Sequence, residues 1–362
     1  MATASSFGTP GDMIEAPTTV VLDPTTDPRW DRLLANRAGD IFHSPPWLRA
    51  LRDTYDLPIE AQVLLGDSGE PIAGFVYAPI NDAMDQRIVS LPFSDFCDPL
   101  ASTPAEWAAV TAGVLTPERR FHLRCLHSEL PLKDPLLAPA GRARWHAVDL
   151  ARDLDDIWQG IASSARRSIR KARDEGVTVR GAESLDDVRL FFELHLNVRK
   201  HKYRLLAQPW PFFKFLWKHL LSEDHGRLLL AEQDGQVIGG VLLLQWGRTL
   251  YYKFNASQPD LLGARPNDLV IWHAIEHGVA TGIERLDFGL SDWDQEGLLR
   301  FKRKYATEEK TIHSLQHVPH PPSPREVELR DLLSRLTSLL TRPDVPDAVS
   351  EGAGNVLYRY FV

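Results

Sequence analysis

The sequence has few cysteines and no long hydrophobic segment, and both absences narrow its class. Among 362 residues only Cys97 and Cys125 are cysteines, which excludes a disulfide framework and a four-cysteine zinc site. We therefore expect a reducing, cytoplasmic environment. The longest apolar run, Val237–Leu244, has the length of a strand and falls far below the ~20 residues of a transmembrane helix. The first residues show neither the basic nor the apolar part of a secretory signal.

Basic residues are also fewer than acidic ones. Lys and Arg number 41 against 49 Asp and Glu, for a net charge of −8. Residues 1–150 carry −8 and residues 151–318 carry +1, so a basic face is expected only in the second half. The overall acidity argues against a general nucleic-acid binder, and we expect no DNA partner. With 43% hydrophobic residues the chain has an ordinary globular composition, and its length suits two domains.

Composition and an internal similarity divide the chain into four segments. We expect a disordered leader over residues 1–19, a first domain over 20–150, a second domain over 151–318 and a helical tail over 319–362. The segment Leu65–Gly74 lies over Ala231–Gly240 at an offset of 166, so that Gly69 meets Gly235. The same offset carries a predicted helix at 104–115 onto another at 267–280. The halves therefore predict duplicated units.

Local signals give each unit the same order: a helix pair, a hairpin, a further strand and a helix. Helix starts are indicated by Asp27 before Pro28, by Thr103 before Pro104 and by Ser184. The hairpin turns contain Gly69 and Gly235. The predicted fold is α/β (α+β), with two tandem domains that each contain a mixed, mostly antiparallel sheet flanked by helices.

Five further segments, in this order, carry a family resemblance. They are 42–47 (FHSPPW), 90–96 (SLPFSDF), 165–177 (ARRSIRKARDEGV), 287–289 (DFG) and 297–302 (GLLRFK). With the duplicated unit, they make the chain resemble the GNAT acyltransferase fold in tandem, as in the FemABX family of aminoacyl transferases and its BioF-associated GNAT-like relatives. The resemblance extends from about Ile41 to Val318.

The resemblance implies transfer of an acyl or aminoacyl group to an amine. In FemABX proteins the donor is an aminoacyl-tRNA and the acceptor a cell-wall peptide precursor, whereas ordinary GNAT enzymes use acyl-CoA. No tightly bound cofactor is expected. Such an enzyme needs to orient its reactants, donate to an oxyanion and remove one proton.

Three residues are predicted to bind the acceptor. Arg199 and Tyr203 lie four apart on a predicted helix and share a face, and Lys302 follows Asp287-Phe288-Gly289 on the next helix. The resemblance implies that Arg199, Tyr203 and Lys302 hold the phosphates of a nucleotide-linked acceptor, which suits an Arg fork and a Lys point charge. The alternative for Arg199 and Tyr203 is a solvated helix end.

Two residues are predicted to be catalytic. Tyr251 and Tyr252 alternate on a strand, so one faces the core, and we assign Tyr252 to the cleft. Asp292 lies in a loop at the mouth of the predicted sheet, where a carboxylate could relay the proton of the amine. Core packing is the alternative for Tyr252, and Asp294 nearby is expected to cap a helix.

The donor is predicted to meet a basic helix face. Arg166, Arg170 and Arg173 form one stripe that would suit the phosphates of tRNA; a solvated basic face is the alternative. The glycine spacing of a CoA pyrophosphate loop is missing in both halves, which favours a donor other than CoA. The long helical arm of some FemABX proteins is missing too, which weighs against tRNA.

Metal signals are weak, and no metal site is predicted. His273, Glu276 and His277 have the spacing of a zinc-protease motif, but no third ligand accompanies them.

The leading interpretation is a cytoplasmic acyl- or aminoacyltransferase that acts on a small-molecule or cell-wall-precursor amine linked to phosphate or sugar. The alternatives are an acyl-CoA-dependent N-acyltransferase in envelope polysaccharide or secondary metabolism, and a catalytically idle GNAT-like binding module.

Overall fold

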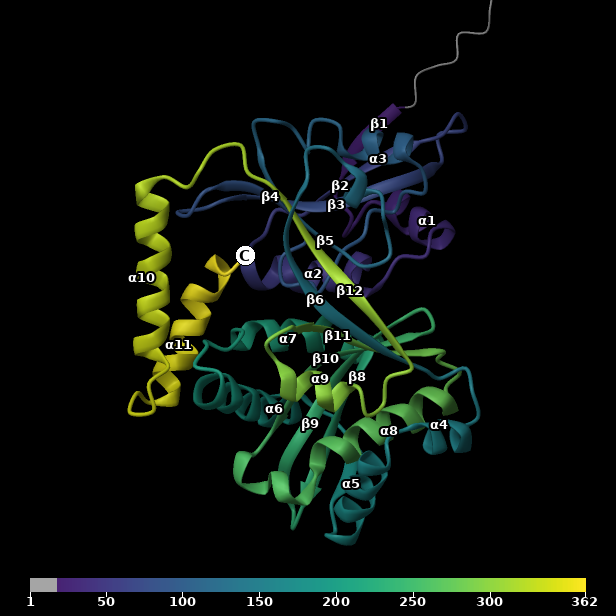
Figure 1. Ribbon diagram of the computed structural model, residues 1–362, viewed down its shortest axis with the longest axis vertical. Coiled ribbons are helices and arrows are strands. Elements are labelled where there is room, and N and C mark those ends of the chain that lie inside the picture. The colour runs from purple at the N-terminus through teal and green to yellow at the C-terminus, as the bar shows by residue number, and fades with distance from the viewer. Residues whose placement is uncertain (1–17) are drawn as a thin grey trace, which may run out of the picture.

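The computed structural model describes residues 18–362 (Figure 1). The predicted leader therefore lies outside the described residues, except for Thr18 and Thr19, which begin the first strand. The first half contains β1 (Thr18–Leu22), α1 (Pro28–Asn36), η1 (Ile41–His43), α2 (Pro45–Tyr55), β2 (Glu60–Leu65), β3 (Pro71–Asn81), β4 (Gln86–Ser90), α3 (Pro104–Thr111), β5 (Arg120–Cys125), η2 (Pro131–Lys133) and β6 (Ala138–Asp149).

The second half repeats this order after an added helix pair. It contains α4 (Leu154–Gly160), α5 (Ser163–Asp174), β7 (Thr178–Gly181), α6 (Leu185–Asn197), η3 (Val198–Lys202), α7 (Trp210–His219), η4 (Leu221–Glu223), β8 (Gly226–Gln233), β9 (Gln236–Trp246), β10 (Thr249–Ser257), η5 (Pro259–Ala264), α8 (Pro266–Ala280), β11 (Arg285–Asp292), α9 (Glu296–Lys302) and β12 (Glu308–His317). The tail forms α10 (Pro324–Leu340), α11 (Asp347–Leu357) and η6 (Tyr358–Tyr360).

Helix starts follow from capping side chains. The Asp27 carboxylate accepts from the Arg29 amide, and the Ser184 hydroxyl from the Asp187 amide. At α10, Ser323 and Glu326 form a capping box, in which each side chain bonds the other residue's amide. The predicted helix over 324–340 is confirmed, whereas α11 was not predicted. None of the helices within residues 18–362 is long and apolar enough to span a membrane.

All twelve strands join in one sheet, in the order β1-β2-β3-β4-β5-β12-β6-β11-β10-β9-β8-β7. The two halves of this order match. In each half an antiparallel meander ends in a parallel pair, β4 with β5 and β10 with β11. The last strand of each half then lies beside the other half's parallel pair: β6 pairs with β11, and β12 pairs with β5. The two halves thus exchange their final strands.

The hairpins β2–β3 and β8–β9 carry the internal similarity seen in the sequence. Gly69 and Gly235 occupy the two turns with the same backbone angle, φ = +77°. Side chains with a Cβ rarely adopt this left-handed conformation, which explains why both turns use glycine. The two halves are therefore similar units of mixed sheet and helix, as the repeat predicts.

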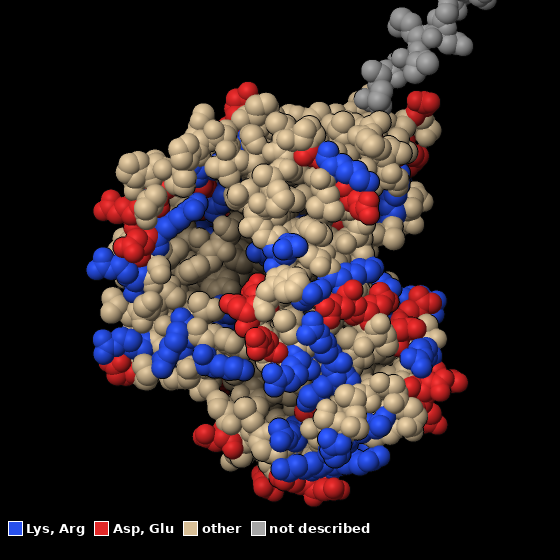
Figure 2. Space-filling view, viewed as in Figure 1, with Lys and Arg blue, Asp and Glu red and all other residues tan. Residues whose placement is uncertain are grey.

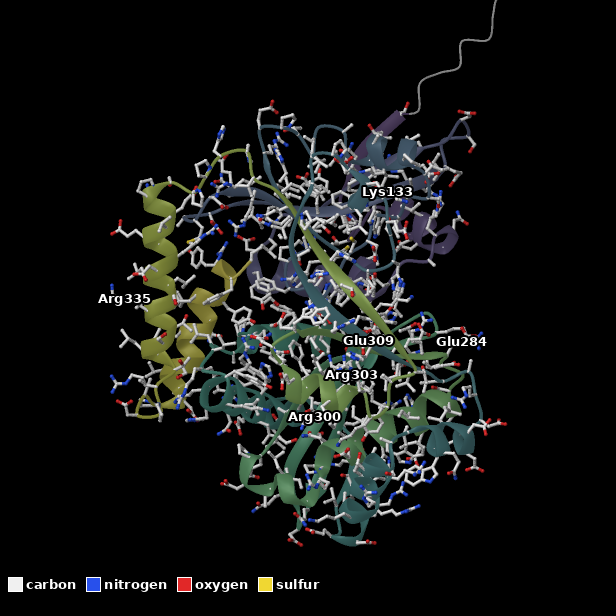
Figure 3. The ribbon with its side chains drawn as sticks, viewed as in Figure 1. Lys133, Glu284, Arg300, Arg303, Glu309 and Arg335 are labelled. Atoms are coloured by element: carbon white, nitrogen blue, oxygen red, sulfur yellow. The ribbon has the colours of Figure 1, made fainter. Side chains whose placement is uncertain are left out.

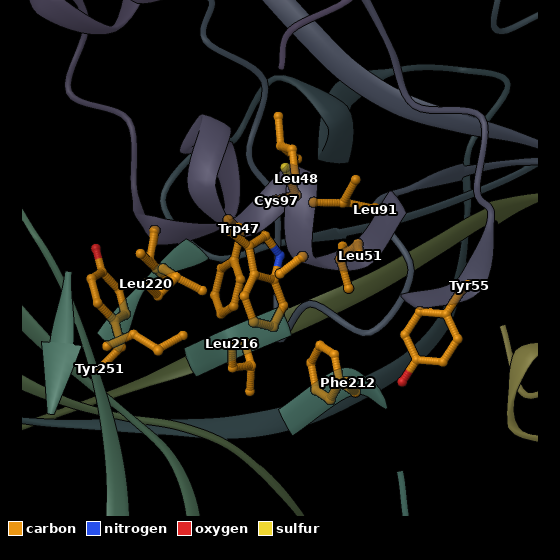
Figure 4. Packing of buried hydrophobic residues seen from close by; sticks show 14 of the residues in the cluster. Trp47, Leu48, Leu51, Tyr55, Leu91, Cys97, Phe212, Leu216, Leu220 and Tyr251 are labelled. Carbon is orange, nitrogen blue, oxygen red and sulfur yellow. The ribbon is translucent and has the colours of Figure 1, made fainter. Parts of the chain in front are cut away.

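The halves share a hydrophobic core. Trp47 and Tyr55 on α2 pack against Phe212 on α7 at ring-centroid distances of 5.9 and 5.7 Å. Figure 4 shows these side chains together with Leu216 of α7 and Leu220, which directly follows α7, between the two halves. Burial of such large aromatic side chains dominates the stability of an interface. The contact therefore holds the two units in a fixed relation.

The helices of the tail stand beside both halves, at the left of Figure 1. Lys200 of η3 is only 1% exposed and donates to the Asp347 carboxylate at 2.6 Å and to the Val345 carbonyl. Arg189 of α6 forms a two-bond pair with Glu351 at 2.7 and 2.9 Å. These contacts fix α11 against the second half.

Candidate functional site

A cavity of about 1080 Å³ opens between the two halves. The first half contributes the loop after β4, and the second half contributes η3, β10, β11 and α9. Its lining includes Phe93, Ser94, Asp95, Arg124, His195, Arg199, Lys202, Tyr203, Gln208, Phe212, Tyr252, Lys253, Phe254, Asn255, Asn267, Phe288, Leu290, Asp292, Asp294, Phe301, Lys302 and Tyr358. Its size slightly exceeds that of ordinary small-ligand pockets, about 300–1,000 Å³.

The cavity exists because two parallel strands separate. β10 pairs with β11 only from Thr249 to Tyr251. Beyond that point β10 has an irregularity between Tyr252 and Phe254, and β11 has one between Asp287 and Leu290. Such bulges redirect side chains and end strand pairing next to binding sites. Here they open the sheet and turn polar groups into the gap.

An ion pair crosses the gap between the halves. The Lys253 ammonium donates to the Asp95 carboxylate at 2.7 Å and to the Phe93 carbonyl at 3.2 Å. It also lies 5.0 Å from the ring centre of Phe42 and 5.1 Å from that of Trp47. Burial alone would raise the pKa of Asp95, but the Lys253 charge and hydrogen bonds hold it below its usual value. Asp95 is therefore a fixed anion that joins the halves.

Gly289 allows this junction to close. Its φ is +62°, and a Cβ there would lie 2.2 Å from an Asp95 oxygen. The next amide, that of Leu290, donates to the same carboxylate at 3.3 Å. Any side chain at position 289 would displace Asp95 and strain the backbone as well. The glycine of the Asp-Phe-Gly segment thus allows close approach, as the sequence indicates.

Asp287 lies beneath this glycine and is fully buried. It accepts from the Trp145 indole N–H at 2.8 Å and from the Gly289 amide at 2.6 Å. Burial raises the pKa of Asp287 to about 7, against the opposing effect of both hydrogen bonds. Trp145 comes from β6, the exchanged strand. The first half thus helps to shape the second half's splayed strands.

Lys302 ends α9 with its ammonium at the base of the cavity. It is 2% exposed and donates to the carbonyls of Gly289 and Leu290 at 3.3 and 3.1 Å. Burial lowers the pKa of Lys302 to about 8, although Asp95, Asp287 and Asp292 act to raise it. The base of α9 is anchored by Arg303, which pairs with Glu309 of β12 at 2.9 Å (Figure 3). The cavity therefore has a positioned cation whose charge is lost as the pH rises through about 8.

The loop that carries Asp95 is held under strain. Leu91 and Phe93 have φ values of +62° and +60°, a conformation that costs non-glycine residues about 1–2 kcal/mol. The Trp47 indole donates to the Ser94 hydroxyl at 3.0 Å and fixes the loop from below. Strained residues of this kind are concentrated at functional sites.

Cations without acidic partners surround the cavity mouth. Arg199 and Lys202 lie in η3, a π-helical turn, and Arg124 lies on β5. Within residues 18–362, none of the three has a carboxylate within 4.0 Å; Arg199 donates instead to the Leu206 carbonyl at 3.1 Å. Tyr203 stands among them, 41% exposed. π-helical turns are rare and frequent at functional sites.

The structure brings five of the eight predicted site residues together. Arg199, Tyr203, Tyr252, Asp292 and Lys302 all line the cavity. Tyr252 faces the cavity, while Tyr251 is buried against Phe42. The Asp292 carboxylate has no cation within 4.0 Å in the described part of the chain. The roles assigned to all five stay predictions.

The three predicted donor-binding arginines lie elsewhere, on α5. Arg166 donates to the carbonyls of Trp158, Gln159 and Ile161 at the end of α4, at 2.7–3.2 Å. Arg173 pairs with Glu276 at 3.3 Å, while Arg170 lies 5.6 Å from the Trp158 ring centre. Arg166 thus connects α5 to the end of α4 through hydrogen bonds. Donor binding by this stripe stays a prediction.

The ion pair that joins the halves at the site was not predicted. Asp95 and Lys253 come from different halves, and no spacing in the sequence connects them. The available signal was local: Lys253 interrupts an aromatic strand between Tyr252 and Phe254.

Among residues 18–362, no group of three His, Cys, Asp or Glu side chains is placed to hold a metal ion, and His273 instead lies 3.5 Å from Glu276.

Comparisons with known proteins agree with this geometry. A search of curated sequences gives no match. Among solved structures, FemX superposes with a TM-score of 0.63 at 12% identity, over 83% of this chain and 97% of its own. A tandem GNAT protein from the clavulanic acid biosynthesis pathway gives 0.52 at 13% identity, over 85% and 100%. L-PGS from Bacillus licheniformis gives 0.52 at 12% identity, over 88% and 99%.

These likenesses confirm the predicted fold, two tandem GNAT-like units in a FemABX-like arrangement. The match to a family model lies in the second half, which contains β10 and β11. Residues 161–303 match the model of the acetyltransferase (GNAT) domain, and the chain is accordingly an acyltransferase with a GNAT domain in its second half.

Proposed function

We propose that this acyltransferase moves an acyl or aminoacyl group onto an amine of a phosphate- or sugar-linked acceptor, in the cavity between the halves. One observation carries the proposal: the Lys302 ammonium lies at the base of the gap between β10 and β11, in a cavity also lined by Asp292, whose carboxylate has no cation within 4.0 Å among residues 18–362. A positioned cation and a carboxylate are what acyl transfer requires.

The chemistry follows from these positions. The acceptor amine attacks the acyl carbonyl carbon, a C–N bond forms, and the carbonyl oxygen becomes an oxyanion. The Lys302 ammonium, already held by two carbonyls, stabilises that charge without reorganisation. Asp292 takes the amine proton and later releases it to solvent. The bond to the leaving oxygen or sulfur then breaks, and the Tyr252 hydroxyl protonates the leaving group and regains a proton from solvent.

The cations at the mouth suit a phosphate on the acceptor. Arg199 presents a guanidinium and Lys202 a point charge, and neither has a carboxylate within 4.0 Å in the region from 18 to 362. Phosphate is bound by such pairs through charge-assisted hydrogen bonds. We assign Arg199 and Tyr203 to this group. The depth of Lys302 favours a role at the reacting carbonyl over the phosphate contact that the sequence suggests.

The geometry at α8 supports a donor other than CoA. GNAT-type pyrophosphate binding relies on amides at a helix N-terminus. Here α8 begins with Pro266, which has no amide hydrogen, and its first turn contains Asp268, whose carboxylate is held by Lys304 at 3.1 Å and Tyr305 at 2.7 Å. The Asp268 carboxylate thus already occupies the first turn of α8, where a bound phosphate would otherwise interact with the positive end of the helix. We favour aminoacyl-tRNA as donor and acyl-CoA as the alternative, with the reaction in the cytoplasm.

A parallel donor screen tests the proposal. The protein is incubated with charged tRNA or with acyl-CoA, each with a mixture of amine acceptors, and products are identified by their mass shift. We expect transfer from charged tRNA and little or no change in melting temperature with millimolar acetyl-CoA, since a ligand stabilises only the state that binds it. A clear thermal shift with acetyl-CoA and transfer from it would establish the alternative. No transfer from either donor would refute the proposal.

A further inference from the structure

A second cavity, of about 730 Å³, lies beneath the helices of the tail. Strands β4, β5 and β12 form one side, and α10 with the last residues of the chain forms the other. The hollow left of centre in Figure 2 lies in this region, between α10 and the strands. Phe93 and Arg124 line both this cavity and the transfer cavity, so the two spaces adjoin.

The position of the second cavity follows from the repeat. It lies where β4 and β5 end their parallel pairing, at Ser90 and Leu123. The transfer cavity lies at the matching place in the second half, where β10 and β11 separate. Each unit thus has a cavity at the same point of its sheet, and only the second-half cavity contains Lys302 and Asp292.

The charged side chains of the second cavity are basic. Its lining contains Arg87, Arg124, Arg204 and Arg330 but no Asp or Glu side chain, and the main-chain oxygen of Val362, also in the lining, accepts from Arg87 at 3.2 Å. Arg87 is neutralised by Asp82 and Asp85, and Arg330 lies 3.6 Å from Asp85.

Arg124 and Arg204 are different. Neither has a carboxylate within 4.0 Å between residues 18 and 362. Arg204 donates to the Thr341 carbonyl at 3.1 Å, and Arg124 makes a long bond to the Ser94 carbonyl at 3.4 Å. A pair of uncompensated guanidinium groups at the lining favours an anion, above all a phosphate.

The rest of the lining is largely apolar. Leu91, Phe93 and Leu333 line it, and Leu205 and Phe361 are each 41% exposed. Large apolar side chains exposed in a concave site indicate an apolar occupant. The hydroxyl of Thr337, a lining residue only 6% exposed, has no hydrogen-bond partner among residues 18–362, although buried polar groups normally have one.

We propose that this second cavity binds an anionic amphiphile, a phosphate ester on a hydrocarbon chain. The hydrocarbon lies against Leu205, Leu333 and Phe361, and the phosphate lies between Arg124 and Arg204. This site is separate from the acceptor phosphate site at Arg199 and Tyr203, so the proposal stands on the second cavity alone.

Binding of dodecyl phosphate below its critical micelle concentration tests the proposal, measured by isothermal titration calorimetry on the full chain without any acyl donor. Inorganic phosphate provides the head alone, and dodecyl maltoside provides the chain with a neutral head. We expect saturable binding of dodecyl phosphate at least tenfold tighter than either. If inorganic phosphate bound as tightly as dodecyl phosphate, the cavity would be a phosphate site without a role for the hydrocarbon. If dodecyl maltoside bound as tightly as dodecyl phosphate, the arginines would have no role in binding. Either result would overturn the proposal.

Paired variants locate the binding. Ser334→Trp fills the cavity from α10, and its control Leu332→Trp alters an exposed α10 residue that is not part of the lining. Arg204→Met removes a lining charge, and its control Arg335→Met removes one from the outer side of α10 (Figure 3). We expect each lining variant to weaken binding at least tenfold and each control to bind like the wild type, with melting temperatures checked throughout. Unchanged affinity in Ser334→Trp would overturn the site. Because the calorimetry is performed without an acyl donor, its result is independent of the outcome of the donor screen.

Discussion

At the scale of single residues, the site contains charged side chains that are largely buried, where hydrophobic side chains would be expected. Asp287 and Lys302 are buried, and the side chains of Lys253 and Asp95 are only 6% and 22% exposed. Removing such groups from water costs several kcal/mol each, and hydrophobic replacements are often more stable. Their presence beside a cavity therefore argues for chemistry at this point, since perturbed pKa values of this kind are concentrated at functional sites.

Lys302 offers the sharpest test at this scale. If its ammonium stabilises the oxyanion, Lys302→Met should lower kcat by about 10²–10³ and leave the acceptor KM nearly unchanged. If it binds the acceptor phosphate, KM should rise instead while kcat is kept. Steady-state kinetics with the donor found in the screen separate the two. Unchanged kcat and KM, at unchanged stability, would make Lys302 a structural residue.

The pH dependence gives an independent reading of the same residue. Because burial lowers the pKa of Lys302 to about 8, its positive charge is lost in the folded protein as the pH rises through 8. Wild-type kcat should therefore fall above that pH. Lys302→Arg keeps its charge throughout, so its lower kcat should show no such fall. The same decline in both proteins would assign it to another group.

Gly289 is a residue whose replacement should damage stability and activity together. Gly289→Ala would place a Cβ 2.2 Å from an Asp95 oxygen at a φ of +62°. We expect a loss of about 2–4 kcal/mol in the free energy of unfolding in urea. The control Gly352→Ala, in α11 with no atom within 4 Å of the added Cβ, should change it by less than about 1 kcal/mol. Similar values for both variants would show that Asp95 can move away.

At the scale of elements, local signals predict the starts of helices well and long-range pairing poorly. The helix starts after Asp27, Thr103 and Ser184 could be read from their caps, and all three are confirmed. The apolar alternation around Trp145 indicates a strand over 145–150, but β6 begins at Ala138, because its first residues have no such alternation. Its partners, β11 and β12, are settled by tertiary contacts that no window of sequence contains. For the same reason, the Asp95–Lys253 pair could not be predicted.

The basic stripe of α5 also belongs to this scale, because only part of it is free to bind tRNA. Arg166→Ala should cost about 1–2 kcal/mol of stability, since the carbonyls at the end of α4 lose their donor. Reversing Arg170 of the stripe and Arg167, which lies one turn before it on α5, to Glu avoids that contact. If tRNA binds here, the reversal should weaken association and reduce the salt slope by about 0.7–0.9 per lost phosphate contact. Filter binding across a salt series measures both. Unchanged binding would place the donor elsewhere.

At the scale of the whole molecule, the exchanged strands make the two units interdependent. Trp145 of β6 supports Asp287 in the second half's splayed strands, while β12 completes the first half beside β5. The core shared by α2 and α7 adds a second connection. A two-unit chain built in this way positions a cavity between its halves rigidly, because neither half can move without breaking sheet hydrogen bonds.

This interdependence predicts how the molecule responds to a cut. A protease site inserted in the exposed connection at residues 151–153 separates the predicted domains at their boundary. The fragments should nevertheless co-elute in size-exclusion chromatography and unfold in one transition, because β6 stays paired with β11 and β12 with β5 across the cut. A matched cut at residues 319–322 leaves α10 and α11 held mainly by side-chain contacts such as Lys200 with Asp347. That fragment should therefore dissociate at a lower urea concentration. Separation of the first pair before the second would contradict strand exchange as the main connection between the halves.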